Sequence, residues 1–181
     1  MAYPLFITTE DAKKFTAANG NIDDDKFIQF LKIAQDIHIQ NYLGSNLFEK
    51  ISADIVAGTL AGDYLNLVTN HIKPMLIHFG MVEFLPFAAY TIANKGVYKH
   101  GSENSSVVDK NEVDFLVEKE RQIAEHYTRR FLDYICANST LFPEYNNNTS
   151  EDMKPDREAS FNGWYLEDDT RDILRYRNLE L

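Results

Sequence analysis

The chain has 181 residues, of which 44% are hydrophobic, and a formal net charge of −10 at pH 7. That length is enough to bury one core and does not require a second domain. The negative charge argues against a protein whose main task is to grip nucleic-acid phosphates, because that task needs clustered Lys and Arg. A single cysteine, Cys136, cannot form an intramolecular disulfide, which is consistent with a reducing compartment.

The first residues lack the basic start and the long apolar core of a secretion signal, so we expect the chain to stay in the cytoplasm. Residues 4–9 are predicted to be extended. A short helix is predicted over residues 9–17, with Thr9 as its N-cap, and the polar residues 19–21 then break the chain.

Residues 23–51 are predicted to form a helical hairpin around which the rest of the chain is organised. Residues 23–25 are aspartates, which supply an N-cap and negative charge at the positive end of the helix dipole, so the first helix should begin there. Gly44 is expected to end this helix in a left-handed conformation. The second helix is expected to restart with a capping box formed by Asn46 and Glu49.

The apolar residues of the first helix occupy more than one face. Ile28, Ile39 and Leu43 fall outside the main face, and a helix with a second apolar face usually contacts two partners. Ile28 and Ile39 are therefore predicted to contact either another element or a neighbouring subunit. The main face is expected to pack on the core. By helical spacing it comprises Phe27, Phe30, Leu31, Ile33, Ala34, Ile37 and Tyr42.

A second helical region is predicted to begin at Asp63, its N-cap, and to be interrupted at Pro74. The following residues 75–93 form the most apolar segment of the chain and raise the question of a membrane span. We reject a membrane span because a histidine, a glutamate and Pro86 interrupt the segment, and its flanks lack a basic cluster. The segment is instead predicted to be a central helix that bends at Pro86.

Residues 95–108 are predicted to form a short β-hairpin that protrudes from a helical body, with residues 97–98 and 107–108 as its strands. Its polar tip is expected to contact a neighbouring subunit, which makes Tyr98 and Glu103 candidate interface residues. A long helix is predicted from about residue 111 to 137. Its apolar stripe, expected to face the core, comprises Val113, Leu116, Val117, Ile123, Ala124, Tyr127, Phe131, Tyr134 and Ile135.

Residues 141–145 are expected to close the globular part, which divides the chain into a helical domain, residues 1–145, and an extended C-terminal arm, residues 146–181. The first half of the arm is polar and is expected to lack fixed structure in isolation. The second half regains bulky apolar residues, which suggest docking on a partner, with packing on the chain's own core as the alternative. The residues predicted to bind the partner are Trp164, Tyr165, Ile173, Leu174 and Tyr176, with Arg171, Arg175 and Arg177 pairing with an acidic surface.

The sequence contains no phosphate-binding glycine loop, no GxSxG elbow and no Cys/His set with zinc spacing, so we predict no enzyme activity and no cofactor. His71 and His78 are seven residues apart, but a proline lies between them and Glu83 is off their shared face. The favoured interpretation is that both histidines are satisfied in the interior. Glu83 is then expected to pair with Arg129 or Arg130, because a buried carboxylate needs a partner.

The order of elements and several turn motifs resemble the small head-tail connector (adaptor) proteins of tailed bacteriophages. The resemblance covers residues 5–145 and implies a mainly α fold, a bundle of about four to five helices with a short protruding β-hairpin. The extended C-terminal arm is not part of the pattern. The segments that carry the resemblance are ITTEDAKKF, IQNYLGSNLFEKI, IKPMLIHFGMVEFLPFAAY, GVYKHGSENSSVV and FLDYICANSTLFPEY.

The resemblance implies a structural protein of the virion neck that forms a ring, commonly of twelve subunits, and is made in the host cytoplasm. Its implied partners are the portal protein, neighbouring connector subunits, the next neck or tail protein, and double-stranded DNA in transit, with no membrane. The acidic charge and the missing catalytic motifs agree with this role. Two alternatives stay open: a cytoplasmic regulatory adaptor that binds one partner through the arm, and a metal-dependent hydrolase using His71, His78 and Glu83.

Overall fold

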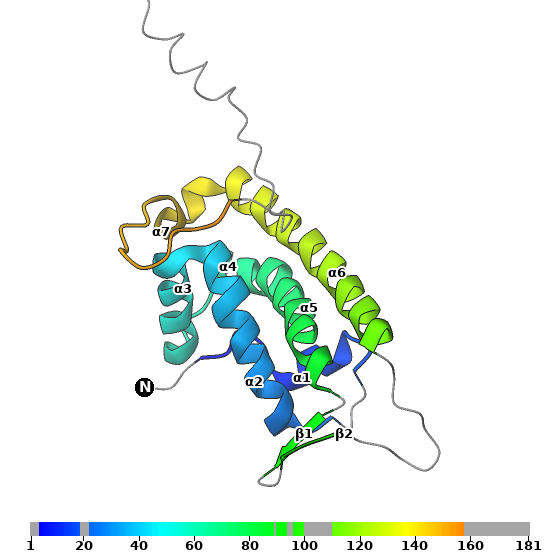
Figure 1. Cartoon of the computed structure of the whole chain (residues 1–181). Coiled ribbons are helices and arrows are strands. Elements are labelled where there is room, and N and C mark those ends of the chain that lie inside the picture. Colours follow the sequence, from blue (N-terminus) through cyan, green and yellow to red (C-terminus); the bar gives the residue numbers. More distant parts are fainter. Residues whose placement is uncertain (1–3, 19–21, 89, 94–95, 100–109, 158–181) are drawn as a thin grey trace, which may run out of the picture.

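The computed structural model is mainly helical, as predicted (Figure 1). It describes residues 4–18, 22–88, 90–93, 96–99 and 110–157. Elements η1 and η2 are π-helical, whereas η3 and η4 are 3-10 helices. In chain order the elements are α1 (Thr9–Lys14), α2 (Asp24–Ala34), η1 (Gln35–Ile39), α3 (Gln40–Ala57), α4 (Gly62–Leu67), η2 (Val68–Ile72), α5 (Lys73–Phe84), η3 (Leu85–Phe87), β1 (Tyr90–Ala93), β2 (Gly96–Lys99), α6 (Lys110–Ala137), η4 (Ser139–Leu141) and α7 (Pro143–Asn146).

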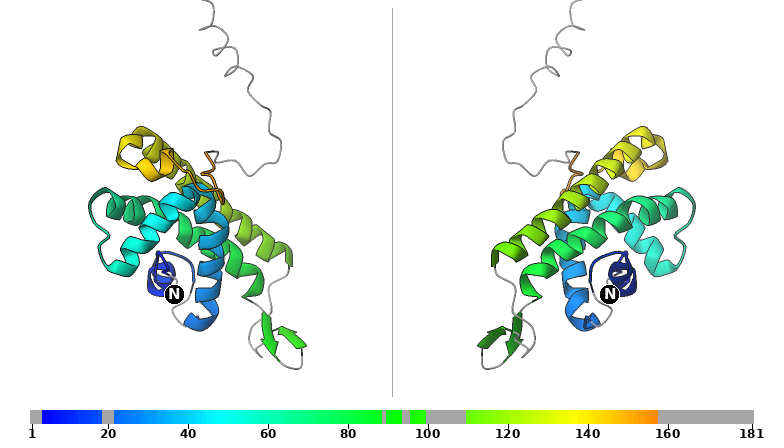
Figure 2. Two further views of the ribbon diagram at one scale, coloured as in Figure 1. Left: turned by 90° about the vertical axis from the view of Figure 1, so that its left-hand side faces the viewer. Right: turned by 90° about the vertical axis from the view of Figure 1, so that its right-hand side faces the viewer.

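Helix α5 forms the centre of the body, with α2 packed on one flank and α6 on another (Figures 1 and 2). Side chains around most of its circumference are buried, as expected for a helix that other helices enclose. No helix within the described ranges combines the length and the apolar character needed to cross a bilayer. The buried residues of α5 are Met75, Leu76, Ile77, Phe79, Gly80, Met81, Val82 and Phe84.

The π-helical turn η1 changes the face that the chain presents to the core. A π-helix has a wider turn than an α-helix, so the residues after it are rotated relative to a continuous α-helix. Ile39 and Leu43 are fully buried for this reason, although regular spacing placed them off the core face. Ile33 and Ile37, predicted to face the core, are exposed. Ile39 thus belongs to the core and not to a surface that a neighbouring subunit reaches, which corrects its predicted role.

Gly44 interrupts α3 with a φ of 69° and a ψ of 162°, so the predicted break occurs at this glycine. A Cβ atom at Gly44 would lie 2.6 Å from both Asn148 Nδ2 and Pro155 Cδ, so no other residue fits without a shift. Asn46, predicted to start a capping box, instead donates its side-chain amide to Asn147 O and Thr149 Oγ1. The break is therefore covered by a segment from the far end of the chain.

That covering segment, residues 147–157, is here called the strap. Ser45 N donates to Met153 O (2.9 Å), and Asp156 N donates to Asn41 O (2.9 Å). The strap was predicted to be the unstructured beginning of the arm, because its composition is polar. Several of its polar groups are instead hydrogen-bonded to α3 and others to each other, so the ordered contacts continue past Tyr145 to residue 157. Residues 158–181 lie outside the described ranges.

Strands β1 and β2 form an antiparallel hairpin, but its strands are not the predicted ones. Tyr98 is paired with Thr91 of the preceding strand, whereas the sequence analysis paired it with residues 107–108. Those residues and the predicted tip, including Glu103, lie outside the described ranges. The central helix is also shorter than predicted, because α5 ends at Phe84 and Pro86 lies in the first turn of η3.

Helix α6 has close to the predicted bounds, but only its second half is buried. Its first half leaves Phe115, Leu116 and Ile123 exposed. The prediction that Ile123 lies in the core is wrong: the neighbouring Ala124 faces the core, and consecutive helical residues point about 100° apart. The buried residues are Ala124, Thr128, Phe131, Leu132 and Ile135.

The N-terminal segment is attached to the body by the buried side chain of Gln35. Phe6 N donates to Gln35 Oε1 (2.8 Å), and Gln35 Nε2 donates to Pro4 O (2.9 Å). Thr8, and not Thr9 as predicted, caps α1 by accepting a hydrogen bond from Asp11 N. These contacts fix α1 beside α5, where it borders the groove described next.

Candidate functional site

His71 and His78 share a face, and this face meets aromatic rings of α6. The His71 ring stacks on Tyr134, with centroids 4.0 Å and planes 17° apart. The His78 ring lies nearly parallel to that of Tyr127, with centroids 5.5 Å and planes 8° apart. The two histidines are seven residues apart, and so are the two tyrosines, but the chain runs in opposite directions through the two sets. The two ring contacts therefore join antiparallel helices. The two histidines therefore serve the packing of η2 and α5 on α6.

Two histidine–carboxylate pairs connect the three central helices. His38 Nε2 donates to Glu83 Oε1 (2.9 Å), which links η1 to α5. His78 Nδ1 donates to Glu120 Oε2 (2.7 Å), which links α5 to α6. Burial lowers the pKa of His38, although the hydrogen bond to Glu83 acts in the opposite direction. Both pairs hold polar groups between helices, where an unpaired charge would be costly.

These pairings separate the residues that a metal site would need. Glu83 pairs with His38, whereas Arg129 or Arg130 was predicted as its partner. His78 pairs with Glu120, and His71 stacks on an aromatic ring. Among the described residues, no three His, Cys, Asp or Glu side chains are grouped so that they could hold a metal ion. The geometry therefore does not support the hydrolase alternative.

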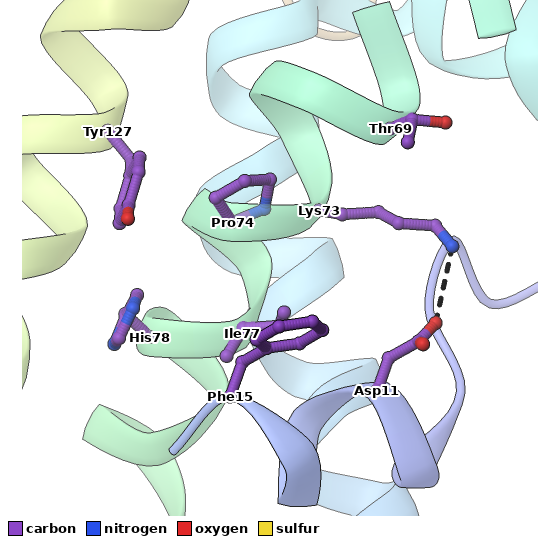
Figure 3. A pocket seen from close by; sticks show the side chains of 8 residues that line it. All are labelled: Asp11, Phe15, Thr69, Lys73, Pro74, Ile77, His78 and Tyr127. Atoms are coloured by element: carbon purple, nitrogen blue, oxygen red, sulfur yellow. Dashed lines mark hydrogen bonds and ion pairs between the residues drawn. The ribbon is translucent and has the colours of Figure 1, made fainter. Parts of the chain in front are cut away.

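A groove of about 440 Å³ lies between α1 and α6, with the first turns of α5 as its floor (Figure 3). Phe15, directly after α1, forms one wall, and its side chain is 62% exposed. On the same side of the groove, Lys73 of α5 forms an ion pair with Asp11 of α1, with 3.2 Å between Nζ and Oδ2. The residues that line the groove are Asp11, Phe15, Thr69, Lys73, Pro74, Ile77, His78 and Tyr127.

Two of the aromatic rings that line the groove each have a cation over them. Lys14 Nζ is 5.6 Å from the Phe15 ring centroid, and Arg130 Cζ is 5.8 Å from that of Tyr127. Both distances fall within the range of cation–π attraction. Burial of Asp11 acts to raise its pKa, but hydrogen bonding to Lys73 and the charge of Lys73 hold it below the usual value. Lys14 and Arg130 are not among the lining residues, so the charged side chains of the groove itself are the paired Lys73 and Asp11.

A second apolar surface lies on α2 and η1. Phe30, Ile33 and Ile37 follow one side of the helix, and we call them the α2 ridge. Ile37 is 57% exposed, and the Phe30 ring stacks on the exposed ring of Phe87 at 5.3 Å. Ile77 lines the groove and Phe79, two residues later on α5, stacks on His38 of η1. Residues two apart on a helix point to nearly opposite sides, so η1 and the groove lie on different sides of α5.

The predicted interface residues have different outcomes. Ile28 is 43% exposed on α2, so it is accessible to a neighbouring molecule, whereas Ile39 is fully buried. Tyr98 lies in β2. The residues predicted for the hairpin tip and the arm lie outside the described ranges: Glu103, Trp164, Tyr165, Arg171, Ile173, Leu174, Arg175, Tyr176 and Arg177.

The sequence analysis missed the groove because its residues come from three separate segments. Phe15 had no assigned role, and Tyr127 was placed in the core stripe of α6. One signal was present: His71 and His78 have the same spacing of seven residues as Tyr127 and Tyr134. Flat side chains at the same spacing on two helices can stack pairwise when the helices pack against each other, as these four do.

Comparison with known families finds one match. The sequence profile of a family of unknown function, DUF6712, matches residues 39–154, from the end of η1 to the strap. No curated protein and no solved structure matches the chain. The matched region includes Gly44, Asn148 and most of the strap, so the break in α3 falls within the family pattern, whereas Pro155 lies just beyond it.

Proposed function

The chain belongs to DUF6712, a family of unknown function whose profile spans more than half of its length, and we propose that it is a structural virion protein of a tailed phage. In this proposal it is a ring-forming head-tail connector. It binds the portal protein and extends the DNA channel to the next neck or tail component. The resemblance of residues 5–145 to such connectors is the starting point.

The observation that carries the proposal is that the body exposes large apolar side chains on two flanks. Ile33 and Ile37 are exposed on the α2 flank, and Phe115 and Leu116 on the α6 flank. Helix α5 lies between α2 and α6 (Figure 2). Two different surfaces on one subunit permit a heterologous contact, in which each copy binds the next, and such contacts form a ring when the rotation between copies closes. A protein that binds one partner requires only one such surface.

The charge of the chain also supports a channel component. A net charge of −10 repels a DNA backbone, so DNA can pass through a ring of such subunits without adhering to it. Portal binding is assigned to the distal part of the arm, where Ile173, Leu174 and Tyr176 supply apolar anchors and the neighbouring arginines pair with acidic surface. Each arm needs only modest affinity, because a ring presents many arms at once.

The test is negative-stain electron microscopy of the purified chain, alone and mixed with the portal protein of the same genome. We expect rings, either free or stacked on the portal. Ile37→Asp should prevent ring formation without unfolding the subunit, because Ile37 is 57% exposed. Val56→Asp is the matched control, since Val56 is 60% exposed and belongs to α3, which forms neither of these two flanks.

A chain that stays monomeric with and without the portal would contradict the proposal. That result would instead fit the regulatory adaptor, which binds one partner and forms no ring. Rings that form equally well with Ile37→Asp would preserve the function but exclude the α2 ridge as an interface. Micrographs of the unmodified chain distinguish the two cases: rings support the proposed function whatever the variant does, whereas monomers alone contradict it.

A further inference from the structure

The α2 ridge and the groove between α1 and α6 lie on different sides of α5. Phe79 of α5 stacks on His38 of η1, with ring centroids 4.1 Å apart, whereas Ile77, two residues earlier on the same helix, lines the groove. Residues two apart on a helix point to nearly opposite sides. A copy of the chain therefore cannot place its own ridge in its own groove, so a ridge that enters a groove must belong to another copy.

The α2 ridge has the pattern of a helix face that fits a groove. Phe30, Ile33 and Ile37 are spaced i, i+3 and i+7, which is the spacing of the side chains that anchor a helix in an apolar groove. Ile33 is 39% and Ile37 57% exposed. Lys26, which is exposed, precedes Phe30 by four residues and so adds a positive charge at one end of the ridge.

The groove continues along α6 as an apolar surface. Leu116, Ile123 and Tyr127, here called the outer stripe, are spaced i, i+7 and i+11 and therefore share one face of the helix. Tyr127 lines the groove opposite Phe15 (Figure 3), whereas Leu116 and Ile123 are 46% and 40% exposed. The outer stripe is about 16 Å long and the α2 ridge about 10 Å, at the rise of an α-helix. The groove and the stripe together can therefore cover every anchor of the ridge.

The two ends of the outer stripe carry opposite charges. Glu112 precedes Leu116 by four residues, so a carboxylate lies at the N-terminal end of the stripe. Arg130 follows Tyr127 by three residues, and its guanidinium carbon is 5.8 Å from the Tyr127 ring centroid. Arg130 does not line the groove, but it places a positive charge beside the C-terminal end of the stripe.

These charges select one direction for a bound ridge. Lys26 and Ile37 are eleven residues apart, as are Leu116 and Tyr127, so the two surfaces match in length. A ridge that runs parallel to α6 brings Lys26 to the end of the stripe that carries the carboxylate. The reverse direction brings Lys26 beside the guanidinium at the other end, where like charges repel.

We propose that the α2 ridge of one copy inserts into the groove of the next copy and runs parallel to its helix α6. Ile37 enters the groove beside Tyr127, and Ile33 covers Ile123. Each copy offers one ridge and one groove, so the contact is heterologous and can repeat from copy to copy. The inference rests on the proposed function, because it assigns the two surfaces that join successive subunits of the ring.

Disulfide cross-linking between two differently tagged chains tests this contact. Both chains carry Cys136→Ser, because the native cysteine is exposed. One chain carries Ile33→Cys and the other Ile123→Cys, at positions that are 39% and 40% exposed, so neither change disturbs the core. The chains are mixed, alone and with the portal protein of the same genome, and are then oxidised. The mixed disulfide should form in several-fold excess over either disulfide between identical chains.

Val56→Cys in place of Ile33→Cys is the matched control. Val56 is 60% exposed but belongs to α3, so this chain should give only background cross-linking with the Ile123→Cys chain. Charge reversal tests the direction. Lys26→Glu in the first chain or Glu112→Lys in the second should lower the yield of mixed disulfide at low ionic strength, and the two together should restore it. Reversals that leave the yield unchanged would overturn the parallel direction.

Two results would overturn the contact itself. One is a main product that joins two Ile33→Cys chains, which would mean that ridge packs on ridge. The other is a mixed disulfide no more abundant than that of the Val56→Cys control, with and without the portal protein. Rings in micrographs without the mixed disulfide would keep the proposed function and overturn this inference. The mixed disulfide without rings would support the contact and contradict the ring.

Discussion

The side chain of Leu31 on α2 occupies the space above Gly80 on α5. A Cβ atom at Gly80 would lie 2.5 Å from Leu31 Cδ2. Leu31 is fully buried, so it cannot move aside without shifting its neighbours. Gly80→Ala should therefore destabilise the protein by about 1 to 2 kcal/mol: overpacking costs roughly 1 to 3 kcal/mol, and the better helix propensity of alanine offsets part of it. Urea unfolding followed by circular dichroism measures the change.

The same pair permits a double-mutant cycle. Leu31→Ala alone should cost about 2 to 5 kcal/mol, because it leaves a cavity in the core. In the Gly80→Ala background part of that cavity is filled by the new methyl group, so the combined cost should fall below the sum of the single costs by more than about 0.5 kcal/mol. Additive costs would mean that the two residues do not share this space.

Ile37 and Ile39 should respond in opposite ways to a charge. Ile39 is fully buried, so Ile39→Asp should cost about 4 kcal/mol or more and can prevent folding, because it leaves a carboxylate without water or a partner. Ile37 is 57% exposed, so Ile37→Asp should change the free energy of unfolding by no more than about 0.5 kcal/mol. Equal losses in the two variants, measured by denaturant unfolding, would contradict the register assigned to η1.

Ser45 should anchor the strap through its hydroxyl. Ser45 Oγ donates to Asp152 Oδ2 (2.7 Å) and accepts from Met153 N (3.1 Å). Ser45→Ala removes both hydrogen bonds and should cost about 1 to 3 kcal/mol. The matched control is Ser52→Ala on the same helix, because the buried Ser52 Oγ has no hydrogen-bond partner among the described residues. That control should be close to neutral, and equal losses in the two variants would exclude an anchoring role.

Truncation should separate the strap from the residues beyond it. A chain that ends at residue 157 keeps every strap contact, so its thermal midpoint should match that of the full chain. A chain that ends at residue 146 loses the hydrogen bonds that join the strap to Ser45 and Asn41, and it uncovers the break at Gly44. Its midpoint should fall by several degrees, as expected for a loss of about 1 to 3 kcal/mol. Equal midpoints would show that the strap only rests on the body.

Mild acid should destabilise the fold through its buried histidines. Burial lowers the pKa of His71, and the charge of Arg130 lowers it further; burial also lowers that of His38. Below the unfolded-state pKa of about 6.5, the unfolded chain binds protons that the folded chain does not, so stability falls as the pH drops toward the folded-state pKa. Within the described residues, His71 Nδ1 is also buried without a partner. His71→Phe keeps a ring on Tyr134 and should reduce the loss of stability between pH 7.5 and about 5.5. An unchanged loss would assign the effect to other groups.

The helical class and most helix positions follow from local signals that sequence reasoning reads well. The aspartates at the start of α2, the glycine at position 44 and the periodic stripe of α6 each act within a few residues. The errors occur where the period changes or where distant segments meet. Regular spacing cannot place Ile39 in the core, because the wider turn of η1 interrupts the period.

The polar strap was misplaced for a related reason. Composition predicts that such a segment cannot bury enough apolar surface to fold, but the strap is held by hydrogen bonds to α3. The groove was missed because Phe15, Pro74 and Tyr127 become neighbours only through tertiary packing. The pairing of His38 with Glu83 depends on the same packing, so no spacing rule connects residues 45 positions apart.

The π-helical turn η1 also determines where the gene can lose a codon. Within α2 itself, deleting one residue would rotate all following side chains by about 100° and turn the core face outward. Inside residues 35–39 the deletion would convert the wide turn into an ordinary α-helical one, and both flanking segments would keep their burial. An alignment of relatives should therefore tolerate a single-residue gap at this turn, and a relative that lacks the extra residue should have an ordinary α-helical turn there with the same residues buried on both sides.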